Sequence, residues 1–178
     1  FNGGIIMAIH YGDGTTSNNG RIIQVLQTHK SGTTTHSGQS WSGNVGGLTQ
    51  AITMSDSNNK VLANWMVCVS ARSGVYSAQT RFVRGTAVLG AGGVHNTNQV
   101  ASSNHYYTSN DNYSDRTFSN MGNGFLDSPG SGTHTYAIQI RGGYTSNDVY
   151  INRLWENSAW SHIGSASSFL TLMEVSYS

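Results

Sequence analysis

The chain has 178 residues, a formal net charge of +1 and 10% charged residues, against about 25% in an ordinary globular domain. Ser, Thr, Asn and Gly make up almost half of it, whereas Lys and Glu occur twice each. This composition excludes a helical bundle or coiled coil, and the single proline excludes collagen. With 37% apolar residues the chain is also unlike a disordered tail.

The first half of the chain predicts strands, because apolar and polar residues alternate with a period of two. Residues 60–71 carry apolar side chains on both faces, which predicts a strand covered on both sides at the centre of a sandwich. Gly85 lies between two further strand-like segments and predicts a hairpin turn. The other strands expected here are residues 4–10, 21–29, 47–53, 75–84 and 86–91.

The second half begins with a less regular stretch, residues 94–114, which we expect to form a long loop or a meandering edge strand. In residues 133–141 an apolar face alternates with a polar one, as in an antiparallel sheet with one wet face. The remaining expected strands are residues 116–126, 149–151 and 168–177. Roughly nine or ten strands with frequent turns predict an all-β protein, a single antiparallel β-sandwich or jelly roll.

No change in composition divides the chain, so we expect one sandwich domain at residues 20–178 and an N-terminal strand or adaptor segment at residues 1–19. Residues 3–10 resemble residues 20–27, which suggests two similar strands paired as a hairpin around Asp13 and Gly14.

Charge and cysteine content limit the partners. Lys and Arg form no basic cluster, so we expect no nucleic-acid binding, which needs many phosphate contacts. The uncharged stretches are polar, so we expect no membrane insertion. Low net charge favours association between copies. Cys68 is the only cysteine and lies in an apolar run, which predicts a buried small side chain rather than a reactive thiol.

Enzymatic chemistry finds little support in the sequence. Most carboxylates lie in turn-like segments, and Glu174 lies in the last strand, where we expect it to face solvent or a subunit interface. No nucleophile elbow, phosphate loop or tight histidine pair occurs. We therefore expect no catalytic residue, no cofactor and no metal, although a histidine on the axis of a symmetric oligomer remains an alternative.

Aromatic residues in polar segments are the candidate recognition residues. They offer large apolar faces at low entropic cost, which suits a glycan or a protein receptor. The alternative is that they close the ends of the sandwich or fill a subunit interface. The candidates are Trp41, His105, Tyr106, Tyr107, Trp155 and Trp160.

An ordered set of short motifs resembles a family of known proteins. The motifs are GRIIQVLQ at residues 20–27, GLTQAIT at 47–53, NKVL at 59–62, FVRG at 82–85, FLDSP at 125–129, TYAIQIR at 135–141, VYINR at 149–153 and LTLMEV at 170–175. Together they resemble small structural and appendage proteins of marine tailed bacteriophages such as cyanophages. Within FLDSP, Asp127 is placed to cap the turn at Pro129.

The resemblance implies a virion structural protein in the extracellular particle, and it leaves tail fibre, head fibre and capsid decoration open. It also implies a trimeric jelly-roll module, so we expect a homotrimer that contacts other virion proteins and a host cell-surface glycan. A monomeric carbohydrate-binding, lectin-like module is the alternative. Residues 1–19 and 94–114 depart from the family pattern and are expected to adapt this chain to its own neighbour or receptor.

Overall fold

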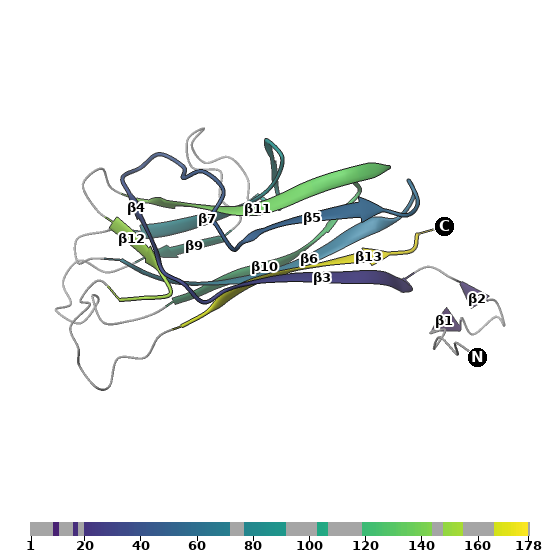
Figure 1. Ribbon diagram of the computed structural model, residues 1–178, viewed down its shortest axis with the longest axis horizontal. Helices are drawn as coiled ribbons and strands as arrows, with labels where there is room; N and C mark the ends of the chain where they lie inside the picture. Colours follow the sequence, from purple (N-terminus) through teal and green to yellow (C-terminus); the bar gives the residue numbers. More distant parts are fainter. Residues whose placement is uncertain are drawn as a thin grey trace.

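The computed structural model describes residues 20–71, 77–91, 119–143, 148–154 and 166–177, together with the backbone of short strands at residues 9–10, 16–17 and 103–106. Apart from the short strands at residues 9–10 and 16–17, which pair with each other, the described residues form two antiparallel sheets that lie face to face (Figure 1). The prediction of an all-β antiparallel sandwich is therefore confirmed.

The first layer is a six-stranded sheet built around the long strand β6 (Lys60–Ala71). One edge of β6 pairs with β10 (Ser119–Asp127). Its other edge pairs first with β13 (Ser168–Val175) and then with β12 (Asp148–Ile151). Strand β3 (Ile22–Lys30) pairs with β13, and β4 (Thr34–Ser37) pairs with β12. Strands β3 and β4 therefore lie on the same side of β6, β3 beyond β13 and β4 beyond β12.

The second layer is a five-stranded sheet. Strand β11 (Gly132–Gly142) pairs with β5 (Thr49–Met54) and with β7 (Ser77–Arg84). Strand β7 also pairs with β8 (Ala87–Leu89) and β9 (Ser103–Tyr106). The predicted hairpin at Gly85 is confirmed, because β7 and β8 pair across it and Gly85 has a φ of 57°, which favours glycine.

The core lies between the layers and joins them through stacked aromatic rings. Trp65 of β6 stacks on Phe82 of β7, with ring centroids 4.7 Å apart. Phe82 stacks in turn on Tyr136 of β11 at 5.4 Å. Trp65 and Tyr136 belong to apolar faces that the period-two pattern predicts, and all three rings are at most 3% exposed.

Three sequence expectations need correction. The described end of the first repeat-like segment, β1 (Ile9–His10), pairs with β2 (Thr16–Ser17) instead of residues 20–27, while β3 pairs with β13. Residues 3–8 lie outside the described residues. The second face of β6 is only half-buried at Leu62 and Met66. Strand β4 was not expected, since its sequence TTHS has no apolar period. Residues 103–106 form β9, which pairs with β7 alone among the described residues, so the edge-strand alternative for residues 94–114 is met there. The rest of that stretch lies outside the described residues.

Candidate functional site

Among the candidate recognition residues, Trp41 is the one whose side chain the structure describes. It lies half-buried in the connection between β4 and β5, which runs along the edge of β11. The guanidinium carbon of Arg81 lies 4.5 Å from the centre of the Trp41 ring, and that of Arg141 lies 5.6 Å from it. Trp41 is therefore the aromatic partner of two cations on the outer face of the five-stranded sheet.

The two arginines are held in place by the strands that carry them. Arg81 and Gln139 are opposite each other in the ladder, and Arg81 Nε donates a 2.6 Å hydrogen bond to Gln139 Oε1. Burial, and then the charge of Arg141, lower the pKa of Arg81. Burial also lowers the pKa of Arg141. Both guanidinium groups nevertheless stay protonated at neutral pH, as arginine side chains do in proteins.

The other candidates are only partly placed. His105 and Tyr106 lie in β9, where their backbones pair with Ala78 and Ser77, and their side chains lie outside the described part of the structure. Tyr107, Trp155 and Trp160 lie outside the described residues altogether.

Glu174 is fully buried, so the expectation that it faces solvent or an interface is wrong. Its Oε1 accepts hydrogen bonds from the backbone N–H and hydroxyl of Ser55 and from Asn59 Nδ2, at 2.7 to 2.8 Å. Its Oε2 accepts one from Gln24 Nε2 at 2.6 Å. Burial alone would raise the pKa of Glu174, but these hydrogen bonds outweigh it and lower the pKa to about 2. Glu174 is a fixed structural anion.

Asp127 also differs from its expected role as a turn cap. Its carboxylate is buried and accepts a 2.6 Å hydrogen bond from the hydroxyl of Tyr136. Arg84 Nη1 lies 3.2 Å from the same carboxylate oxygen. Burial, followed by the hydrogen bond and the negative charge of Asp127, raises the pKa of Tyr136. Asp127 therefore joins the core to the end of the sandwich instead of capping its own turn.

In the described ranges the cysteine is buried and the metal-ligating residue types are scattered. Cys68 is buried, as predicted, and burial raises the pKa of its thiol. Within the described ranges no three His, Cys, Asp or Glu side chains gather closely enough to hold a metal ion. A long apolar helix that could cross a membrane is likewise absent from the part of the chain that the structure describes.

The outer face of the six-stranded sheet carries a row of apolar side chains across four strands. Val25 of β3 lies opposite Met173 of β13, Met173 lies opposite Leu62 of β6, and Leu62 lies opposite Leu126 of β10. Directly opposite residues of an antiparallel pair project to the same face. Val25 is 56% exposed and Leu126 is 50% exposed. The row therefore ends in two apolar side chains that stand in solvent.

Two further rows on the same face are polar or mixed, and neither carries a formal charge. They are Gln27, Thr171, Asn64 and Gly124, followed by His29, Phe169, Met66 and Gly122. Gln27 Nε2 donates a 2.8 Å hydrogen bond to Thr171 Oγ1 across the strands. We call the three rows the uncharged face. No sequence motif marks it, because its members come from four segments far apart in the chain.

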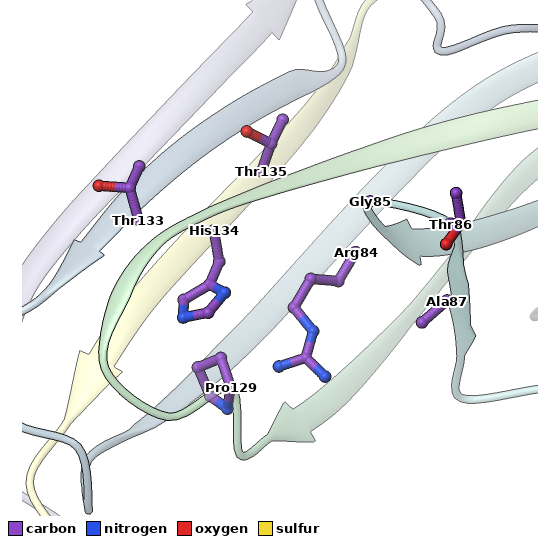
Figure 2. A pocket seen from close by; sticks show the side chains of 8 residues that line it. All are labelled: Arg84, Gly85, Thr86, Ala87, Pro129, Thr133, His134 and Thr135. Atoms are coloured by element: carbon purple, nitrogen blue, oxygen red, sulfur yellow. The ribbon is translucent and has the colours of Figure 1, made fainter.

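A pocket of about 510 Å³ opens at one end of the sandwich, beside the turn that follows β10. Figure 2 shows Arg84 of β7 and His134 of β11 extending side by side toward Pro129. The other lining residues are Gly85, Thr86, Ala87, Thr133 and Thr135. No sequence pattern marks this site, because its residues come from three separate turns and strand ends.

Comparison with known proteins adds no relative: the chain matches no family model and no curated protein.

Proposed function

We propose that this chain is a non-enzymatic structural protein of a tailed phage virion, part of a fibre, decoration or other appendage, which assembles with copies of itself and contacts the host surface. The observation that carries the proposal is the uncharged face of the six-stranded sheet. The motif resemblance supplies the virion context, and the face supplies a physical reason for assembly. An extracellular particle is the corresponding location.

Exposed apolar groups on a sheet face favour burial against another surface. The two ends of the apolar row, Val25 and Leu126, are about half exposed, so covering them removes apolar area from water. Four strands about 4.8 Å apart and three rows that span five residues at about 3.4 Å each give a face of roughly 15 by 17 Å. Covering it on two copies buries on the order of 500 Å², so a specific interface between copies needs further surface beside this face.

The absence of charge on this face also fits an interface between copies. A buried charge needs a partner with good geometry, and identical copies place like charges together. Small residues on β10 keep part of the face flat. A Cβ at Gly122 would lie 2.4 Å from the backbone oxygen of Trp65, so this position cannot carry a side chain without moving β6.

Strand β3 offers a second contact surface beside the uncharged face. Among the described residues β3 pairs along one edge only, with β13. Residues 22–28 of this strand carry no charge, whereas edge strands of monomers are usually protected by Lys, Pro or a bulge. A cyclic trimer needs two different patches on each copy. The face and the open edge of β3 supply such a pair.

Light scattering on the purified chain tests the assembly part of this proposal. A trimer that persists on dilution is the expected result, and a monomer at micromolar concentration contradicts it. A reconstruction of the assembled particle tests whether the chain is a virion protein. A particle in which no density fits this sandwich contradicts the virion location and leaves self-assembly untouched.

A carbohydrate-binding module is the second candidate, and one observation on the outer face of the five-stranded sheet favours it. Trp41 and Arg81 form a cationic aromatic surface there, and Gln79 projects from the same face of β7. A glycan array compares the chain with its Trp41→Ala variant, and binding that survives this change contradicts the assignment.

A further inference from the structure

The pocket at the end of the sandwich combines a fixed cation, a ring acceptor and apolar walls. Arg84 and His134 come from neighbouring strands and extend toward Pro129, as Figure 2 shows. Ala87 and Pro129 supply apolar surface, and Thr86 supplies a hydroxyl. None of the lining residues is acidic. The lining itself therefore carries no carboxylate, and Asp127, the anion that pairs with Arg84, lies behind it.

Arg84 is held by a carboxylate that lies behind it. Asp127 is 7% exposed, and its Oδ2 is shared by Arg84 Nη1 at 3.2 Å and by the hydroxyl of Tyr136 at 2.6 Å. The Arg84 side chain is 26% exposed, so the cation stands at the mouth while the anion stands inside. A guanidinium has five N–H donors in a rigid fork. The pair with Asp127 orients this fork and leaves donors for a ligand at the mouth.

His134 is oriented by its own turn. His134 Nε2 lies 3.0 Å from the backbone oxygen of Ser131, a carbonyl that can only accept. Nε2 therefore carries the proton, and in the neutral ring Nδ1 is left as an acceptor. An acceptor of this kind suits a ligand hydroxyl. The donors of Arg84 suit a carboxylate, which guanidinium groups bind through two parallel hydrogen bonds.

We propose that this pocket binds the carboxylate of an acidic sugar, that is, a uronic acid residue of a polysaccharide. Arg84 binds the carboxylate, His134 Nδ1 accepts a hydroxyl proton, and the rings and methyl groups of Pro129 and Ala87 contact the apolar face of the sugar. The volume of about 510 Å³ lies within the range of small-molecule sites and exceeds what a simple anion fills. The inference rests on the host-surface part of the proposed function and is independent of self-association.

Calorimetric titration with trigalacturonic acid tests this inference, with a neutral galactose trisaccharide and inorganic phosphate as separate ligands. We expect binding of the acidic trisaccharide alone. Arg84→Lys keeps a cation beside Asp127 but loses the fork, so affinity falls about tenfold. His134→Leu weakens binding about threefold through the lost hydroxyl contact. Arg153→Lys is the matched control and keeps full affinity, since Arg153 lies over the ring of Tyr150 on the other sheet.

Each outcome decides a separate point. Absence of binding by the unaltered chain, or equal binding of the neutral trisaccharide, overturns the inference. Equal binding of phosphate shows a general anion site and overturns the sugar assignment. An equal loss of affinity in Arg84→Lys and Arg153→Lys also contradicts it. Thermal unfolding of each variant shows whether it folds, and light scattering on the same samples reports self-association separately.

Discussion

Glu174 accepts a 2.7 Å hydrogen bond from the side-chain amide of Asn59, a residue 115 positions away in the sequence. The contact ties the end of β13 to the turn that precedes β6. Asn59 Oδ1 in turn accepts a hydrogen bond from the backbone N–H of Tyr177 at 3.3 Å. A buried carboxylate without a cation among its contacts is thus held by neutral donors that arrive from separate parts of the chain.

Glu174→Gln is expected to lower the free energy of unfolding by about 1–3 kcal/mol. In the unaltered chain Gln24 Nε2 donates to Glu174 Oε2 and to the backbone oxygen of Thr53. The substitution replaces that carboxylate oxygen by an N–H₂ group. Two donors then face each other, and one stays unpaired. Urea unfolding at neutral pH measures the change. Asp56→Asn, in an exposed turn, is the control and is expected to change stability little; equal effects of the two substitutions contradict the prediction.

The same carboxylate predicts a pH dependence of stability. Its pKa in the folded state is about 2, below the ordinary value of 4.5, so the folded chain binds fewer protons at this group than the unfolded chain. The stabilisation is present above pH 4.5 and is lost as the pH falls toward 2. Urea unfolding from pH 6 to pH 2 is expected to show the two stability curves of the unaltered chain and Glu174→Gln converging in acid. Stability curves that stay parallel between pH 6 and pH 2 contradict the assigned pKa shift of Glu174.

Tyr136→Phe is expected to destabilise the fold by about 1–2 kcal/mol. The substitution removes the hydroxyl that donates to Asp127 and leaves the ring stacked on Phe82, so it tests the hydrogen bond separately from the packing. Tyr177→Phe is the matched control, because Tyr177 is 51% exposed. Denaturant unfolding compares the two, and a larger loss at Tyr177 than at Tyr136 is incompatible with the role given to Asp127.

Two glycines of β10 give a prediction with its own internal comparison. A Cβ at Gly122 would lie 2.4 Å from a backbone oxygen, whereas a Cβ at Gly124 would meet the side-chain oxygen of Asn64 at 3.0 Å. A side chain can rotate away, but paired strands can separate only by breaking their ladder. Gly122→Ala is therefore expected to lower thermal stability clearly more than Gly124→Ala. The reverse order of melting temperatures refutes this explanation.

The sequence predicts most of the fold, because the apolar period is carried by single strands. Val61, Ala63 and Trp65 alternate within β6, and the structure buries all three. The prediction fails where the cause lies in another segment. Strand β4 has no apolar pattern and forms through pairing with β12. The burial of Glu174 depends on donors from Gln24, Ser55 and Asn59, which no local pattern connects.

The candidate sites show the same limit. Trp41 could be selected from sequence as an aromatic residue among small polar ones, but the two arginines beside it depend on the pairing of β7 with β11. The uncharged face depends on the register of four strands. Once that register is known, alternate residues of each strand identify it directly. A single sequence does not provide the register.

The uncharged face gives the last prediction. Val25→Lys and Leu126→Lys place a charge at either end of the apolar row, on side chains that are 56% and 50% exposed. Lysine at these positions stays hydrated in an isolated chain, so monomer stability is expected to change by less than about 0.5 kcal/mol. Between copies the same charge is desolvated and meets its equivalents, so the double variant is expected to dissociate at concentrations at least tenfold higher than the unaltered chain. Sedimentation equilibrium measures the dissociation.

Ala51→Lys on β5, an exposed strand position on the other sheet, is the control and is expected to keep the assembly intact. If the double variant assembles as tightly as the Ala51→Lys control, the uncharged face is not where the copies meet.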